Sequence, residues 1–160
     1  MSKENKERQP VSVGKKWAWM IVGAAVVVAA YIVVAPDGSR IPGASYRDGT
    51  VVARGEALYR LHCAPCHGAS GAGENPQSPM GGVKDDGSFL APALDGTGHA
   101  WHHAPDQLFG IIKNGSPAAG SKMVAWAGKM SDEEIDAVMA YFRSLWPEAI
   151  QSRYGQMFGN

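Results

Sequence analysis

The stretch Cys63-Ala64-Pro65-Cys66-His67 decides how the rest of this chain is interpreted. A zinc site needs two further ligands at matching spacing, and a redox dithiol normally follows a strand in a βαβ pattern, which the sequence lacks. A histidine directly after the second cysteine is instead the pattern of covalent haem attachment. The pentapeptide therefore predicts one haem c, joined by thioether bonds to Cys63 and Cys66, which are the two cysteines of the 160-residue chain.

His67 follows the second cysteine immediately, so its imidazole is expected to bind the iron from the same side. A second ligand on the opposite face is expected if the site transfers electrons, because six-coordinate iron changes little in geometry between redox states. A thioether sulfur in that position favours ferrous iron and raises the potential. The candidate ligands are Met80, Met123, Met130, Met139 and Met157.

The N-terminal end of the chain has the pattern of a membrane anchor. Residues 1–16 carry five basic and two acidic side chains, and residues 17–35 carry no charge. An apolar run of this length is close to the ~20 residues that a helix needs to cross a bilayer. Under the positive-inside rule, the basic segment stays cytoplasmic and everything after Ala35 is exported. The sequence thus predicts a single-pass inner (cytoplasmic) membrane protein with a periplasmic haem domain, and a cleaved signal peptide is the alternative.

The remaining sequence divides where its composition changes. Residues 36–49 combine proline and glycine with polar residues and predict a linker. Residues 50–147 contain the haem motif and predict the folded domain, and residues 148–160 predict a tail that can extend as a short helix. From residue 36 onward the chain has 10 basic and 13 acidic side chains, and this mildly acidic balance argues against a nucleic-acid partner.

Helical patterns dominate the folded domain, and no strand pattern is present. Residues 50–62 have apolar side chains at helical spacing and lead directly into the haem motif. Residues 106–114 predict a second helix that Gly115 ends. The clearest helix begins at residues 131–134, Ser-Asp-Glu-Glu, which form a capping box, and ends before Pro147.

The haem motif and these helices together resemble the class I, mitochondrial-cytochrome-c-like family over residues 50–147. Gly55 and Tyr59 match the small and aromatic residues of the family's first helix, which pack against its last helix. Val138 and Tyr141 are the expected partners there. The resemblance implies an all-α fold of about three to five short helices around one haem c, here with one N-terminal transmembrane helix in addition.

The resemblance also assigns the contacts with the cofactor. Pro92 matches the proline whose carbonyl accepts a hydrogen bond from the proximal histidine, a contact that orients the ligand. Met123 matches the distal methionine, so the resemblance implies His67 and Met123 as the iron ligands, although Val124 replaces the proline that usually follows. The predicted cofactor-binding residues are therefore Cys63, Cys66, His67, Met123, Pro92, Trp101 and Trp126.

Residues 99–103 concentrate three histidines around Trp101. Trp101 or a neighbouring histidine can donate a hydrogen bond to a haem propionate. The alternative is a copper or zinc site, because His99 and His103 would share one face of a helical turn, with His102 beside them. The sequence leaves this choice open.

The resemblance implies an electron carrier rather than an enzyme. The most similar members are single-haem, membrane-tethered bacterial cytochromes that pass single electrons between respiratory-chain components such as a quinol-oxidising complex and a terminal oxidase. The expected partners are redox proteins and the membrane, with no nucleic acid and no small-molecule substrate. Two alternatives stay open: a permanent haem c subunit of a larger oxidase or dehydrogenase complex, and a haem sensor or copper-handling protein.

Overall fold

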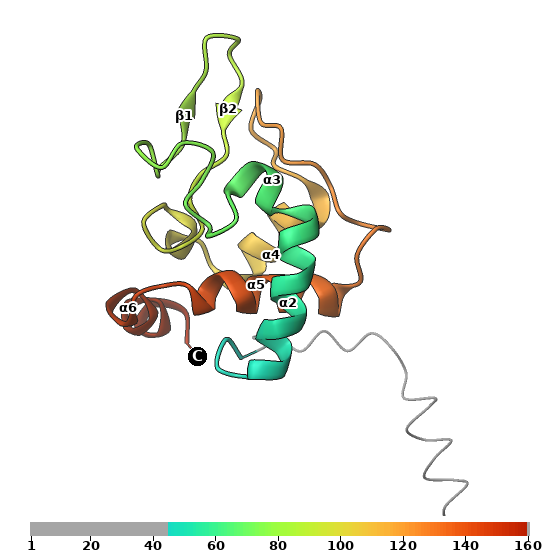
Figure 1. Cartoon of the computed structure of the whole chain (residues 1–160), viewed down its shortest axis with the longest axis vertical. Coiled ribbons are helices and arrows are strands. Elements are labelled where there is room, and N and C mark those ends of the chain that lie inside the picture. Colours follow the sequence, from blue (N-terminus) through green and yellow to red (C-terminus); the bar gives the residue numbers. More distant parts are fainter. Residues whose placement is uncertain (1–44, 160) are drawn as a thin grey trace, which may run out of the picture. The chain divides into compact units, whose positions relative to one another are not determined.

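A computed structural model describes residues 45–159 and shows a mainly helical domain in that range (Figure 1). A two-stranded antiparallel hairpin is the departure from the predicted all-α fold; its strands pair Gly82 with Leu90 and Val83 with Phe89. Strands of two residues are too short to produce the alternation by which a strand is recognised in a sequence. The elements in chain order are α2 (Gly49–His62), α3 (Ala64–His67), β1 (Gly82–Val83), β2 (Phe89–Leu90), the 3₁₀ helix η1 (Ala100–His102), α4 (Pro105–Asn114), α5 (Asp132–Ser144) and α6 (Glu148–Phe158).

Among the described elements, helices α2 and α5 make the most extensive contact, and α2 runs across α5 (Figure 1). A Cβ atom added to Gly55 would lie 1.9 Å from the carbonyl oxygen of Ala137, so a residue larger than glycine would force the two helices apart at this crossing. One turn later, the rings of Tyr59 and Tyr141 have their centroids 5.0 Å apart. The predicted packing of the first helix on the last helix of the haem domain is confirmed, with Val138 buried beside it.

The helix starts follow from local hydrogen bonds. The predicted capping box of α5 is present: the Glu134 N–H donates to Ser131 Oγ at 3.3 Å, and the Ser131 N–H donates to the Glu134 carboxylate at 3.0 Å. At the start of α2, the Asp48 carboxylate accepts from the N–H groups of Thr50 and Val51 at 2.9 and 3.3 Å. These side chains satisfy backbone donors that have no partner inside the helix.

The segment predicted as a tail, residues 148–160, contains a helix that packs on the end of α5. Tyr154 of α6 is fully buried, and its ring centroid lies 5.0 Å from that of Trp146. The Arg143 guanidinium lies 4.6 Å from the ring centroids of both Tyr46 and Tyr154, where the negative faces of the rings attract the cation. Helix α6 is therefore an integral part of the fold.

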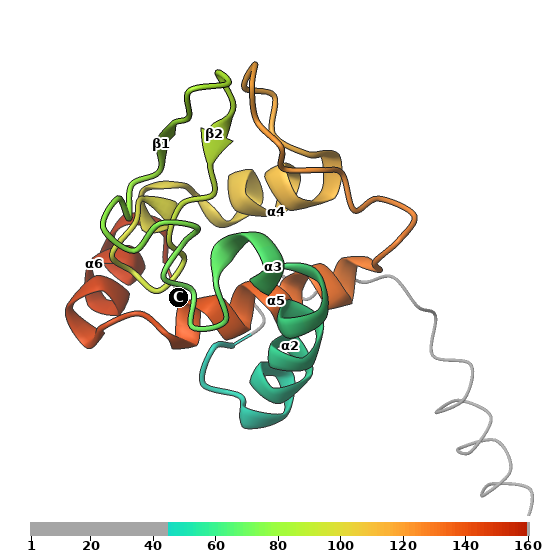
Figure 2. The same ribbon diagram turned by 45° about the horizontal axis from the view of Figure 1, so that its top comes forward.

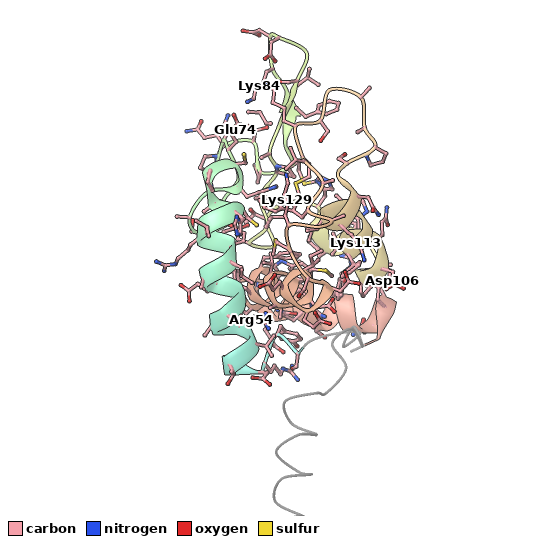
Figure 3. The ribbon with its side chains drawn as sticks, turned by 90° about the vertical axis from the view of Figure 1, so that its right-hand side faces the viewer. Arg54, Glu74, Lys84, Asp106, Lys113 and Lys129 are labelled. Atoms are coloured by element: carbon pink, nitrogen blue, oxygen red, sulfur yellow. The ribbon has the colours of Figure 1, made fainter. Side chains whose placement is uncertain are left out.

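Ion pairs connect neighbouring helices at the surface. Arg54 of α2 pairs with Glu134 at the start of α5 at 3.4 Å, and Lys113 of α4 pairs with Asp132 at 2.7 Å. Figure 3 shows Arg54 and Lys113 on their separate helices. Exposed pairs of this kind contribute only ~0–1 kcal/mol each, so the buried aromatic and aliphatic contacts hold the helices together.

The structure contradicts the predicted membrane location. Within residues 45–159, no helix has both the length and the apolar character of a membrane span. The longest helix of that range, α2, has 14 residues, which is about 21 Å of rise against the roughly 30 Å of a bilayer core. This finding overturns the predicted single-pass inner-membrane placement with a periplasmic haem domain. The proposed span, residues 17–35, lies outside the described residues, as do residues 1–16 and most of the predicted linker.

Candidate functional site

A cavity of about 610 Å³ opens between α3, the hairpin, α4 and the segment that follows α4. This volume lies in the range of pockets that bury a small-molecule cofactor. Large apolar side chains that are more than a third exposed gather at its walls, and a flat apolar group such as a porphyrin would cover them. These side chains are Met80 (55% exposed), Val83 (67%), Phe89 (37%) and Val124 (53%).

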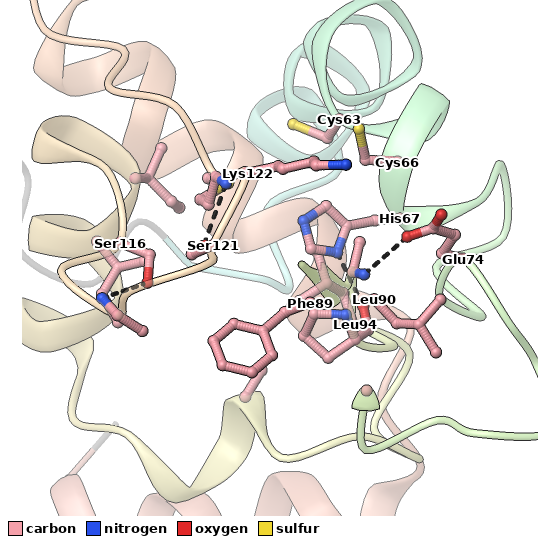
Figure 4. Close-up of a pocket in the computed structure, with 18 of the residues that line it drawn as sticks. Cys63, Cys66, His67, Glu74, Phe89, Leu90, Leu94, Ser116, Ser121 and Lys122 are labelled. Atoms are coloured by element: carbon pink, nitrogen blue, oxygen red, sulfur yellow. Dashed lines mark hydrogen bonds between the residues drawn. The ribbon is translucent and has the colours of Figure 1, made fainter. Parts of the chain in front are cut away.

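The haem-attachment motif lies on one wall of this cavity. The N–H groups of Cys66 and His67 both donate to the carbonyl of Cys63, at 3.1 and 2.9 Å, so the motif forms a single helical turn. Pro65 stands in the first turn of α3, where its fixed φ suits a helix start. Figure 4 shows Cys63, Cys66 and His67 together at this wall. In the chain without haem, burial and then the charge of Cys66 raise the pKa of the Cys63 thiol to about 11.

His67 is oriented by a hydrogen bond to the backbone of Pro92. The Nδ1 atom lies 2.8 Å from the Pro92 carbonyl oxygen, which can only accept, so Nδ1 carries the proton. The lone pair of Nε2 is then free for a metal, as in other histidine ligands held by a carbonyl. Burial lowers the pKa of His67, against the opposing effect of the Pro92 hydrogen bond. The neutral imidazole that a metal requires is thus the favoured form.

A glycine keeps the loop after the motif close to Pro92. Gly73 has φ = 85°, and its N–H donates to the His67 carbonyl at 2.8 Å. A Cβ atom on Gly73 would lie 2.9 Å from the backbone nitrogen of Ala93. The left-handed backbone and the close approach both require glycine here. This loop therefore brings the Pro92 carbonyl to His67 across 25 residues of chain.

The structure separates the five candidate methionines. Met130 and Met139 are buried in the core at 7% and 6% exposure and do not line the cavity, and neither does Met157 of α6. Met80 does line it, but its segment packs beside Pro92: the Ala93 N–H donates to the Pro79 carbonyl at 2.9 Å. Met80 therefore belongs to the wall that carries His67.

Met123 lines the cavity from the segment that follows α4. The Ser116 N–H donates to the Met123 carbonyl at 3.2 Å, and the Met123 N–H donates to Ser121 Oγ at 3.2 Å. Gly115, with φ = 82°, ends α4 as predicted, and a Cβ atom there would lie 3.1 Å from the Met123 carbonyl oxygen. Figure 4 shows Ser116 and Ser121 across the pocket from His67. Met123 thus lines the cavity from a segment that lies across the pocket from His67.

The two predicted tryptophans lie in different places. Trp126 lines the cavity, and its ring centroid lies 4.8 Å from that of His62. Trp101 does not line the cavity; its ring contacts His102 and lies under the Arg153 guanidinium at 5.1 Å. The cavity thus unites the other predicted site residues: Cys63, Cys66, His67, Pro92, Met123 and Trp126.

The hairpin is the part of the site that the sequence reasoning missed. Val83, Lys84, Phe89 and Leu90 all line the cavity. The signal available in the sequence is the apolar pair Phe89-Leu90 within a stretch rich in glycine, serine and proline. The Phe89 N–H donates to the Gly120 carbonyl at 3.1 Å, which joins the hairpin to the segment after α4. Figure 2 shows the two standing side by side at one end of the domain.

The histidine cluster does not form a metal centre by itself. Within residues 45–159, no three side chains of histidine, cysteine, aspartate or glutamate are arranged to hold a metal ion. The alternative of a copper or zinc site at residues 99–103 therefore finds no support in this part of the chain. His99 and His103 line the haem cavity instead, whereas His102 does not.

Comparison with known proteins identifies the family. A family model described as "Cytochrome C oxidase, cbb3-type, subunit III" matches residues 50–142. The chain is 33% identical over 99 residues to a "Dihydro-heme d1 dehydrogenase" of Pseudomonas aeruginosa, covering 62% of this chain and 16% of that protein. It is 28% identical over 120 residues to a "Thiosulfate dehydrogenase" of Stutzerimonas stutzeri, covering 69% of this chain and 34% of that protein. A comparison with solved structures gave no match.

The resemblance seen in the sequence is thereby confirmed, and so is the cofactor. Both relatives extend well beyond the part that this chain matches, so their names describe larger proteins. The family match covers more than half of the chain and includes the attachment motif on the cavity wall. This chain therefore belongs to the c-type cytochrome family described as cytochrome c oxidase, cbb3-type, subunit III, and is an electron-transfer protein with covalently bound haem c.

Proposed function

We propose that this chain is a single-haem electron carrier in which His67 and Met123 bind the iron from opposite faces. The observation that carries the proposal is the pairing of two separately anchored side chains on one cavity. His67 is oriented by the Pro92 carbonyl at 2.8 Å, and Met123 lies in a segment bonded back onto itself through Ser116. Ligands that are fixed before and after electron transfer keep the reorganisation of the site small.

The cavity walls are suited to setting the potential of the site. Haem c supplies a one-electron iron couple when it is bound. The Leu94, Leu108 and Ile112 side chains line the cavity and would give a bound haem an apolar surrounding. Apolar surroundings disfavour the more highly charged ferric state, and a thioether ligand acts in the same direction. We expect a positive midpoint potential, suited to a carrier that feeds an oxidase.

The proposed partners are redox proteins of a respiratory chain, such as a quinol-oxidising complex as donor and a terminal oxidase as acceptor. The description of the family as an oxidase subunit supports this assignment. A second candidate is a permanent haem c subunit of a larger oxidase or dehydrogenase complex. It is supported by the two relatives, which are named as dehydrogenases and of which this chain matches only a part. Purification of the native protein at fixed stoichiometry with a larger complex would favour the subunit.

Optical spectra of the wild type and of Met123→Ala test the ligand assignment. The wild type should show the sulfur-to-iron charge-transfer band when oxidised and should resist rapid carbon monoxide binding when reduced. Met123→Ala should lose the band and bind carbon monoxide. Met80→Ala is the matched control, because Met80 also lines the cavity but on the wall of His67. A band that survives in Met123→Ala, or disappears in Met80→Ala, would reject Met123 as the ligand.

A further inference from the structure

Two imidazoles that take no part in the proposed ligation lie in the wall of the haem cavity. His99 and His103 stand on either side of η1, with their ring centroids 5.4 Å apart in an edge-to-face arrangement. Both rings are half-buried, whereas His102, between them in sequence, is exposed and does not line the cavity. The fold has therefore brought two imidazoles, side chains that can bind a proton, to the site of the cofactor.

The charged side chains around this pair come from the cavity wall and from α6. Among residues 45–159, no carboxylate lies within ion-pair distance of His99 or His103, and His99 is hydrogen-bonded to the backbone of Met80. The other charged side chains of the cavity wall are paired with one another or with a neighbour. Lys84 pairs with Glu74, and Lys122 pairs with Asp86 at 3.4 Å. Helix α6 presents Arg153 to the same segment, over the ring of Trp101.

We propose that His99 and His103 form a proton-binding pair that couples proton uptake to reduction of the haem. When the site is oxidised, the extra positive charge of ferric iron opposes protonation of an imidazole in the same low-dielectric cavity. When one electron enters from a redox partner, that opposition falls and one imidazole nitrogen takes a proton from solvent. When the electron leaves to the next partner, the proton returns to solvent. The inference rests on the electron-transfer function proposed above.

The short separation of the rings limits the pair to one proton. Two imidazolium charges with centroids 5.4 Å apart in a partly buried wall repel each other, so binding of one proton opposes binding of a second. Burial first, and then the charges of His103 and His102, lower the pKa of His99, which disfavours its charged form. The ring of Trp101, held under Arg153, fixes the position of the segment that carries both histidines.

The test is the pH dependence of the midpoint potential, measured by spectroelectrochemistry on the haem-loaded protein. In the wild type, the reduction equilibrium constant should fall with rising pH across the neutral range. Its limit is a tenfold fall per pH unit, equivalent to 59 mV for a one-electron couple. The double variant His99→Gln/His103→Gln should lose this dependence. His102→Gln, the matched control on the exposed residue, should keep it.

Two results would overturn the proposal: a wild-type potential that does not change with pH, or a slope that the double variant retains in full. Titration of the histidine ring signals by NMR gives an independent measurement, because the shared pKa should be higher in the reduced protein. The sulfur-to-iron band in the oxidised spectra separates this test from that of the proposed function. A wild type without the band refutes the Met123 ligation, whereas a variant that keeps the band has kept its haem environment.

Discussion

The two sides of this domain are built in different ways. Where α5 packs against α2, and where α6 packs on the end of α5, the protein's own side chains fill the interior: Tyr59, Ile135 and Tyr154 have 0% exposure. Around the haem cavity, large apolar side chains such as Val83 and Val124 remain more than half exposed on either side of about 610 Å³. Figure 2 shows the helices of the first side and, above them, the hairpin and the segment after α4. We infer that protein side chains alone fill the interior of the first side, whereas the apolar side chains of the second side need the haem as their packing partner.

The rim of the cavity consists of the hairpin and the segment after α4, and few contacts join these two parts. The hairpin meets the segment after α4 through the hydrogen bond from Phe89 to Gly120 and an exposed ion pair between Lys122 and Asp86. Such an ion pair contributes only ~0–1 kcal/mol. At the base of the hairpin, Lys84 is bonded to Glu74, and Figure 3 shows these two side chains close together. We therefore expect the order of the rim to depend on the cofactor.

Removing the haem attachment should have the largest effect on the difference between the two sides. In Cys63→Ala/Cys66→Ala, the thioether bonds cannot form, and we expect no haem to remain on the chain under denaturing conditions. Because the rim then loses its apolar partner, its amides should exchange hydrogen on the order of 100-fold faster, while those of α2 and α5 change far less. Hydrogen exchange read by mass spectrometry compares residues 82–90 with residues 132–144. An equal loss of protection in both regions would mean that the two sides are one cooperative unit.

A substitution at the α2–α5 crossing should destabilise the side whose interior is filled by protein side chains. Gly55→Ala places a methyl group 1.9 Å from the Ala137 carbonyl oxygen, so the helices must separate. We expect a loss of about 3 kcal/mol in the free energy of unfolding. Gly110→Ala is the control: Gly110 lies inside α4 with nothing within 4 Å of an added Cβ, and alanine there should add about 0.5–1 kcal/mol. Urea unfolding measures both, and similar effects for the two variants would contradict the steric argument.

The sequence predicts the first side of the molecule better than the second. The capping box at Ser131 acts within one helix, so its pattern is short and local. The family resemblance supplied Gly55 at the helix crossing, and the structure places it there against Ala137. The hydrogen bond from His67 to Pro92 could be predicted because the family resemblance supplied it, and the structure contains it at 2.8 Å. The assignment of Met123 as the distal ligand stays a prediction.

The parts that the sequence did not predict depend on contacts between distant residues. The docking of α6 rests on Arg143, whose guanidinium lies between the rings of Tyr46 and Tyr154, 108 residues apart along the chain. The hairpin has strands of two residues, and its cavity-lining role appears only when the segment after α4 lies beside it. Trp101, predicted as a haem contact, does not line the cavity, and its ring lies under the Arg153 guanidinium of α6. No local periodicity encodes such pairings.

The smallest expected effect on the free energy of unfolding comes from removing the hydroxyl group of either of two buried tyrosines, which differ in their hydrogen-bond partners. Both are fully buried, but the Tyr59 hydroxyl donates to the Gly68 carbonyl at 3.0 Å, whereas the Tyr154 hydroxyl has no hydrogen-bond partner among the described residues. Tyr59→Phe removes one of the two donors of the Gly68 carbonyl, which also accepts from the Gly71 N–H at 3.1 Å, and we expect a loss of about 1 kcal/mol. Tyr154→Phe removes an unsatisfied group and should change the free energy of unfolding by less than about 0.5 kcal/mol.

Urea unfolding of the haem-loaded variants measures the difference between these two tyrosines, provided that the slope with denaturant stays constant. Because Gly68 directly follows His67, Tyr59 connects the side filled by protein to the side completed by haem. The hydrogen exchange of residues 64–68 should therefore rise in Tyr59→Phe and stay unchanged in Tyr154→Phe. If Tyr154→Phe costs as much as Tyr59→Phe, the Tyr154 hydroxyl has a partner, and the α6 side is held by more than the packing of its rings.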